Sequence, residues 1–191
     1  MKILALACCV CSLGFAQEFK VSTTTFTADG FSKESTPVVA GIQLRDIKKR
    51  PLELTTRGLT LVQYWSRCCG GEADVWATAR DMEARYKKAG LTTYSINFEN
   101  GTTFFEQYDQ VMAFLKGKEM PENLYFDFMG YANDDLKISG FPTYLLVSPE
   151  GNIVFRAKVK EDKALAALEE EIEMWLDRIS RQAEAPKINM K

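Results

Sequence analysis

The stretch that decides the expected fold is Leu-Thr-Leu-Val-Gln-Tyr-Trp-Ser-Arg-Cys-Cys-Gly-Gly-Glu, which occupies residues 59–72. Its first half is mostly apolar, as is typical of a central strand, and it ends in the pair Tyr64-Trp65. A helical pattern begins after the two glycines, so Cys68 and Cys69 lie where a strand passes into a helix. A thiol at such a junction is near the positive end of a helix dipole, which favours the thiolate. The stretch therefore predicts a reactive cysteine.

The composition limits both the size of the fold and its chemistry. The chain has 191 residues, of which 46% are hydrophobic and 26% are charged, and this suits one globular domain with a sizeable core. The formal net charge of -2 does not favour a nucleic-acid partner. The sequence contains no histidine, which excludes Ser-His-Asp and Cys-His catalysis and most catalytic zinc sites. No cofactor is expected.

Residues 1–16 have the pattern of a secretory signal peptide. Lys2 precedes an apolar run, and Gly14 and Ala16 supply the small residues expected before a cleavage site. The run is shorter than the roughly 20 apolar residues of a transmembrane helix. We expect cleavage before Gln17 and export to the periplasm or the medium, with no stable membrane anchor afterwards.

Cleavage would change the cysteine chemistry, because Cys8, Cys9 and Cys11 would leave with the signal. The exported chain would keep Cys68 and Cys69 in an oxidising compartment, where two adjacent cysteines cannot form a scaffold of structural disulfides. A lipoprotein anchor on Cys8 or Cys9 is an alternative, but the residues before Cys8 fit that pattern poorly.

Periodicity predicts a mixed α/β domain over residues 38–178, after an extension at 17–37 that holds at most one edge strand and before a tail at 179–191. The expected strands are 38–44 and 52–54, which form a hairpin, then 59–65, 91–98, 124–128, 143–147 and 153–159, and the expected helices are 75–90, 105–115, 131–138 and 161–181. Lys48-Lys49-Arg50 is interpreted as a polar hairpin turn, and Glu169-Glu170-Glu171 as the solvated face of the last helix.

Two separate motifs resemble one known family. Residues 64–72 resemble the aromatic-Trp-Ala-Thr-Trp-Cys-x-x-Cys segment of thioredoxin-fold proteins of the TlpA/ResA type, which are extracytoplasmic thiol–disulfide oxidoreductases. Gly140-Phe141-Pro142-Thr143, followed by the turn at 148–153, resembles the cis-proline strand and hairpin of the same family. The resemblance implies a thioredoxin-like three-layer α/β fold with a central mixed sheet, an N-terminal β-hairpin extension and flanking helices.

The resemblance also implies roles for particular residues. Cys69 falls on the nucleophilic cysteine of the family, four residues after the matching Trp65. Pro142 falls on the cis-proline that offers backbone to an incoming extended chain, and Phe141 and Gly140 would shape its approach. Trp65 is included among the expected substrate-binding residues.

Two departures from the family pattern alter the expected chemistry. Glu72 occupies the place of the resolving cysteine and cannot attack a mixed disulfide, and Cys68 replaces the aromatic residue before the nucleophile. The charge of Glu72 would raise the pKa of the Cys69 thiol, whereas Arg67 would lower it, so the sign of the net effect stays open. Glu72 is either a proton acceptor for Cys69 or, as we prefer, a carboxylate at a helix start.

Several functions are compatible with this pattern. The preferred one is thiol–disulfide exchange with extracytoplasmic protein thiols and an external thiol reductant, in which Cys69 acts alone or Cys68 resolves it as a strained vicinal disulfide. A soft-metal site on the two thiols and a non-catalytic binding or scaffold protein are alternatives. A thiol peroxidase is weaker still, resting on a faint likeness of Ser66, Cys69 and Glu72 to the peroxiredoxin loop.

Overall fold

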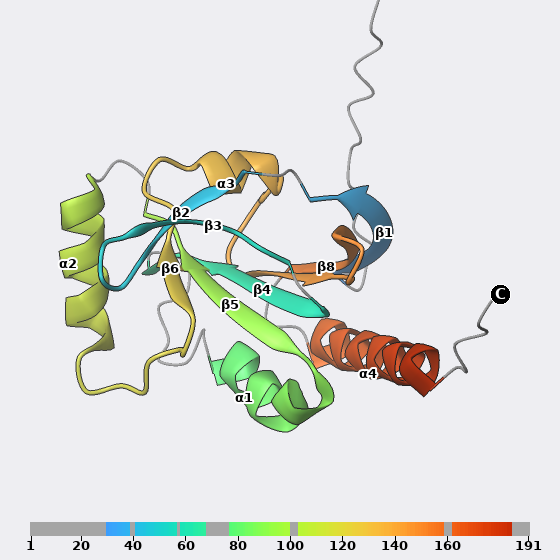
Figure 1. Cartoon of the computed structure of the whole chain (residues 1–191). Coiled ribbons are helices and arrows are strands. Elements are labelled where there is room, and N and C mark those ends of the chain that lie inside the picture. Colours follow the sequence, from blue (N-terminus) through green and yellow to red (C-terminus); the bar gives the residue numbers. More distant parts are fainter. Residues whose placement is uncertain are drawn as a thin grey trace, which may run out of the picture.

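The computed structural model describes residues 30–38, 41–56, 58–67, 77–99, 103–158 and 162–184 (Figure 1). The predicted signal peptide and the predicted site residues Cys68, Cys69 and Glu72 lie outside the described residues. The described parts of the predicted site are therefore the segments that precede and follow residues 68–76 and the loop around Pro142.

From β1 onward, strands and helices follow one another in the order that the sequence predicts. The elements are β1 (Phe31–Pro37), β2 (Gln43–Asp46), β3 (Pro51–Glu53), β4 (Thr60–Trp65), α1 (Ala77–Tyr86), the 3-10 turn η2 (Lys87–Ala89), β5 (Thr92–Asn97), α2 (Phe104–Leu115), β6 (Leu124–Phe126), α3 (Tyr131–Asp135), β7 (Thr143–Val147), β8 (Asn152–Lys158) and α4 (Asp162–Glu184).

The strands form one mixed sheet in the order β1-β8-β7-β4-β5-β6-β2-β3. Strands β4, β5 and β6 run parallel to one another, and the other neighbours pair antiparallel. Strand β4 lies in the middle, and all six of its residues are buried, as expected for an apolar run that is covered on both faces. The predicted central strand, the β2–β3 hairpin and the β7–β8 hairpin are confirmed.

Helices cover both faces of the sheet and complete three layers. Leu61 of β4 faces the side where α1 and α4 lie, and it shares a buried cluster with Met82 and Leu168 of those helices (Figure 1). Val62, the next residue, points to the opposite side and packs in a cluster with Leu136 near α3. A third cluster joins α2 to the end of β4 and to β6.

Several element boundaries differ from the prediction, and one N-terminal strand agrees with it. Strand β2 begins at Gln43 rather than at residue 38, after Gly41, whose φ of 85° is a left-handed conformation. Strand β1 is the single edge strand expected within residues 17–37, and it pairs antiparallel with β8, where Phe31 stacks on Phe155 with ring centroids 5.3 Å apart. Helix α4 continues to Glu184, past the predicted end at residue 181.

The interpretation of residues 169–171 as a solvated face is wrong for Glu171. Its side chain is only 5% exposed, lies 2.6 Å from the ammonium of Lys33 in β1, and accepts a hydrogen bond from Nε1 of Trp175. Consecutive residues of a helix point about 100° apart, so three adjacent glutamates cannot share one face. Glu171 falls on the side of α4 that packs against the sheet.

In the described part of the chain, none of the helices combines the length and the apolar character needed to cross a bilayer.

Candidate functional site

The end of β4 supports the segment that leads to the cysteines. Trp65, the last residue of β4, is completely buried and packs against Phe114 of α2, with ring centroids 6.3 Å apart. Its indole Nε1 donates to Ser95 Oγ at 2.8 Å, which satisfies the polar edge of the ring. The Trp65 ring therefore braces the end of the strand from inside, and Cys68 follows three residues later in the chain.

A buried carboxylate holds the two described residues before the cysteines. Glu99, which is 6% exposed, accepts from the backbone N–H of Arg67 at 2.8 Å and from Ser66 Oγ at 3.1 Å. Its Oε1 also accepts from Asn97 Nδ2 at 3.0 Å. The sequence analysis missed Glu99. The signal that could have found it is its position just after a strand parallel to β4, because the carboxyl ends of parallel neighbours meet at one edge of a sheet.

Arg67 was expected to be the local cation beside the thiols, but its charge is compensated. Its guanidinium Nε lies 3.4 Å from Glu99 Oε1 in an ion pair, and another guanidinium nitrogen donates to Gln110 on α2. A cation that forms an ion pair with a carboxylate lowers the pKa of a neighbouring thiol less than an unpaired cation would. Within the described residues, the positive charge of Arg67 is therefore paired with the negative charge of Glu99.

The loop at residues 140–142 lies beside the end of β4. Strands β4 and β7 pair antiparallel with Tyr64 opposite Thr143, so the loop before β7 reaches the same edge of the sheet as Trp65. The Phe141–Pro142 peptide bond is cis, and Pro142 is buried. Thr143 Oγ1 donates to the carbonyl of Gly140 at 2.7 Å and tightens the loop. The structure thus brings the described start of the first motif beside the second motif.

An aromatic cluster connects this loop to the sheet. The ring of Phe141 stacks on Tyr64 with centroids 5.9 Å apart, and Phe98 lies 6.3 Å from Phe141 and 6.4 Å from Tyr64. Both Phe141 and Phe98 are only partly buried, so they present ring surface at the edge where β4 and β5 end. This surface is apolar, and it is adjacent in space to the segment that leads to Cys68.

A buried acid and phenol pair lies behind the aromatic cluster. Tyr64 donates its hydroxyl hydrogen to Asp127 Oδ2, which also accepts from the backbone N–H of Asn133 at 2.9 Å. Burial raises the pKa of Asp127, although these hydrogen bonds oppose the increase. Burial and the nearby Asp127 charge both raise the pKa of Tyr64. The phenol therefore stays protonated and keeps its role as a donor.

A polar chain runs through the sheet on the other side of β4. Gln63 Nε2 lies 3.3 Å from the hydroxyl of Tyr144, and Ser95 Oγ lies 3.5 Å from Gln63 Oε1. Burial raises the pKa of Tyr144, so its hydroxyl is neutral and can both donate and accept. These polar contacts satisfy the hydrogen-bonding groups of the β4 side chains that face α1.

Within the described residues, no group of three or more Cys, Asp or Glu side chains is arranged to hold a metal ion.

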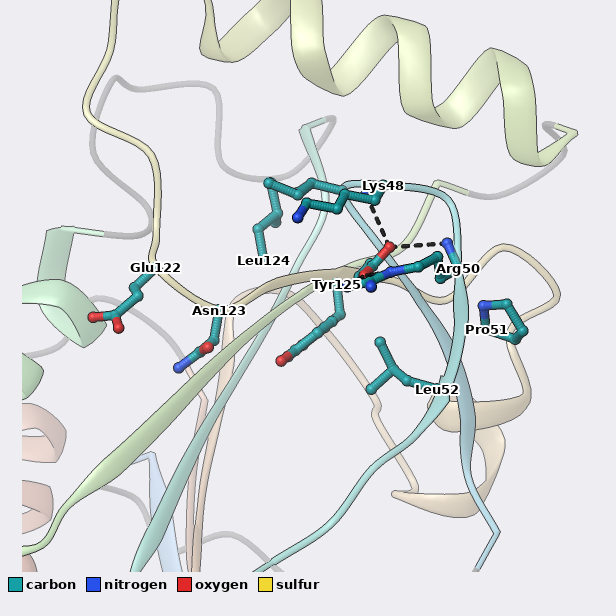
Figure 2. Close-up of a pocket in the computed structure, with 10 residues that line it drawn as sticks. Lys48, Arg50, Pro51, Leu52, Glu122, Asn123, Leu124 and Tyr125 are labelled. Carbon is teal, nitrogen blue, oxygen red and sulfur yellow. Dashed lines mark hydrogen bonds and ion pairs between the residues drawn. The ribbon is translucent and has the colours of Figure 1, made fainter.

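A separate hollow of about 480 Å³ lies at the other end of the parallel strands, between the β2–β3 turn and the start of β6 (Figure 2). Leu124 in its wall pairs with Ser95 in the middle of β5, so the wall continues away from Asn97 and Glu99. The turn is polar, as predicted, and Asp46 Oδ1 accepts from the backbone N–H groups of Lys48 and Arg50 at 2.8 and 2.9 Å. None of the predicted site residues lines the hollow.

Comparisons with known proteins agree with this architecture. No family model matches the sequence, and no curated protein matches it. Solved structures do match. A candidate thiol:disulfide interchange protein DsbE from Chlorobium tepidum superposes with a TM-score of 0.64 at 21% identity, over 76% of this chain and 98% of that chain. The protein has a thioredoxin-like fold.

Two further structures have the same architecture. The thioredoxin domain of a thiol-disulfide oxidoreductase from Bacteroides vulgatus gives a TM-score of 0.53 at 20% identity, over 74% of this chain and 99% of that chain. A thiol:disulfide interchange protein of the thioredoxin family from Chlorobium tepidum TLS gives 0.57 at 14% identity, over 76% and 99%. Identities at this level establish the thioredoxin-like fold, so the activity has to be argued from the site.

Proposed function

We propose that the protein carries out thiol–disulfide exchange with protein thiols, and that Cys69 is the nucleophile. The observation that supports this proposal is the meeting of two segments at one edge of the sheet. The end of β4, which leads directly to Cys68 and Cys69, lies beside the loop that contains Pro142. In a thioredoxin-like fold this is the arrangement in which a thiol and a backbone platform can receive an extended chain together.

The proposed reaction has two steps. The Cys69 thiolate attacks one sulfur of a substrate disulfide, a Cys69–substrate disulfide forms, and the other substrate sulfur leaves as a thiolate. An external thiolate then attacks the substrate sulfur of the mixed disulfide, forms a disulfide with the substrate, and releases Cys69 as a thiolate. In the alternative second step Cys68 attacks Cys69, which releases the substrate thiol and leaves a vicinal disulfide that an external reductant must reduce. Glu72 takes part in neither transfer.

Residues near the thiol would orient the substrate rather than react with it. Pro142, Phe141 and Gly140 would present backbone and ring surface to the extended chain that carries the disulfide. The pattern of residues 1–16 supports a location outside the cytoplasm. An intact mass that begins at Gln17 for protein recovered from the periplasm is the expected result, and retention of residues 1–16 would contradict export with cleavage.

The test of the nucleophile uses each cysteine as the control for the other. Cys69→Ser should abolish the mixed disulfide formed with a peptide that carries an activated disulfide, measured by intact mass without reductant. Cys68→Ser should still form it, and should accumulate it if Cys68 is the resolving thiol. Capture that persists unchanged in Cys69→Ser would refute the assignment.

The second candidate function is a non-catalytic binding module. The pairing of Arg67 with Glu99 favours it, because the cation that would stabilise a Cys69 thiolate is compensated. The same pairing weakens a peroxidase function, which needs that cation at the thiol. Glu72→Cys separates the two main candidates, since a second thiol at the helix start should create dithiol reductase activity toward insulin if Cys69 is accessible. A folded but inert Glu72→Cys protein would favour the binding module.

A further inference from the structure

Glu99 has more contacts at the end of β4 than a surface carboxylate would make. Its two oxygens receive the backbone N–H of Arg67, the Ser66 hydroxyl and the Asn97 amide, and the Arg67 guanidinium lies 3.4 Å away. Two of these groups belong to the two residues that immediately precede Cys68. A buried carboxylate that accepts this many hydrogen bonds has a fixed orientation, and it fixes the positions of the groups that donate to it.

The far side of the network is fixed by helix α2. Gln107, which is fully buried, donates through Nε2 to the backbone carbonyl of Asn97 at 2.9 Å and to its side-chain oxygen at 3.0 Å. The Asn97 amide in turn donates to Glu99 and lies 3.4 Å from the carbonyl of Trp65. The ends of β4 and β5 and the first turn of α2 are therefore connected through Glu99 and Asn97.

Glu99 also controls the charge next to the cysteines. Consecutive Cα atoms are about 3.8 Å apart, so the Cα of Cys69 lies within about 7.6 Å of the Cα of Arg67. A full charge close to a thiol shifts the pKa of that thiol. The charged groups of the described network are Arg67 and Glu99, whereas α2 and β5 contribute the neutral amides of Gln107, Gln110 and Asn97.

We propose that Glu99 is a positioning residue of the thiol site. It fixes the chain that enters the cysteine pair, and it restrains the acidity of the Cys69 thiol by neutralising Arg67. This inference rests on the proposed function of Cys69. Its consequence is that the thiol is less acidic than it would be beside an unpaired Arg67 cation, so a smaller fraction of it is thiolate at neutral pH.

The test compares the pH dependence of alkylation of Cys69 in a Cys68→Ser background, read on the peptide that contains Cys69. Glu99→Gln keeps the size of the side chain and removes its charge. Removal of the negative charge that neutralises Arg67 should lower the midpoint of the alkylation profile by up to about one pKa unit, and alkylation below the midpoint should become up to about tenfold faster.

Two further variants make the result specific. Arg67→Gln should raise the midpoint, which is the opposite sign. Glu122→Gln is the matched control, because Glu122 also pairs with a cation, Lys87, but lies just before β6, whose first residue pairs with the middle of β5, away from Glu99. It should leave the midpoint unchanged. A merely structural role for Glu99 would change stability without producing opposite shifts in Glu99→Gln and Arg67→Gln.

The outcomes separate this inference from the proposed function. An unchanged or higher midpoint in folded Glu99→Gln overturns the role of Glu99 and leaves the nucleophile untouched. A Cys69 thiol that titrates as expected but never captures a disulfide overturns the proposed function alone, since the alkylation measurement does not depend on exchange. A thiol that resists alkylation at every pH in all folded variants overturns both.

Discussion

Arg156 is the residue whose loss should most clearly reveal how the sheet is held together. It lies in β8, is 1% exposed, and its Nε lies 2.8 Å from Oε1 of Glu34 in β1. One of its guanidinium nitrogens also donates to the carbonyls of Leu136 at 2.9 Å and Lys137 at 3.4 Å. A single buried cation thus connects β8, the edge strand and the end of α3. The perturbation is Arg156→Met, which keeps an unbranched chain and removes the charge.

The expected loss follows from what the substitution leaves behind. Removing one partner of a buried ion pair costs about 3–5 kcal/mol, and an orphaned buried carbonyl adds about 1–3 kcal/mol. Glu34 keeps a hydrogen bond from Thr36 Oγ1 at 2.8 Å, and its side chain is 13% exposed, so water can reach it in part. The methionine side chain would also recover some apolar packing. We therefore expect about 3 kcal/mol, or a melting temperature about 6–12 °C lower for a chain of this size.

The assay is thermal and urea unfolding followed by circular dichroism, with Arg181→Met as the matched control. Arg181 makes the same kind of pair, with Asp177 at 2.8 Å, but its side chain is 77% exposed. Loss of an exposed pair should change stability by less than about 0.5 kcal/mol. The double variant Glu34→Gln with Arg156→Met should recover part of the loss, because the orphaned charge is gone. If Arg156→Met unfolds within about 1 kcal/mol of the unmodified protein, the buried pair does not hold β1 in place.

Two further predictions concern residues behind the loop at 140–142. Because burial raises the pKa of Asp127 above 3.8, the folded protein binds this proton more tightly than the unfolded chain. The stability of the protein relative to Asp127→Asn should therefore be greatest near or below about pH 4 and should decline as the pH rises through the pKa of Asp127 in the folded state. Urea unfolding of both proteins at several pH values measures this difference in stability. A stability advantage over Asp127→Asn that grows with pH would contradict the prediction. Gly130→Ala should cost more than Gly117→Ala in the same assay. The two glycines have similar left-handed φ values of 76° and 78°, but only the new Cβ at residue 130 comes within 3.2 Å of the Phe98 ring. Equal losses of stability in the two variants would show that the Phe98 ring moves away from this contact at no cost.

Much of the fold could be predicted because the decisive patterns are local. The apolar run that becomes β4 has no polar face, so it had to lie in the middle of the sheet. The turn at residues 149–152 and the alternation around it specify the β7–β8 hairpin. The stripe of Leu168 and Ile172 in the last helix specifies which side meets the sheet. Each of these signals is complete within a short stretch of chain.

The parts that were missed depend on partners that are distant in sequence. Glu99 lies 32 residues after Arg67, and nothing at either position reveals the other until β4 and β5 pair. Arg156 was included in a predicted strand without any reason for a buried charge, because its partner Glu34 lies in the segment expected to be an extension. The ion pair of Glu171 with Lys33 was missed for the same reason, since Lys33 comes from that segment too. Sequence reasoning underestimated β1 throughout.

The candidate site itself depends on the register of three adjacent strands. Tyr64 pairs with Thr143 on one side of β4, and Trp65 pairs with Asn97 on the other, so the loop at 140–142 and the carboxylate of Glu99 arrive at the same end as the cysteine segment. A slip of one residue between any two strands would turn every side chain to the opposite face and separate these groups. The buried polar contacts of Gln63 and Trp65 oppose such a slip, because it would leave their donors unsatisfied inside the sheet. The polar residues within β4 therefore stabilise the geometry on which any chemistry at Cys69 depends.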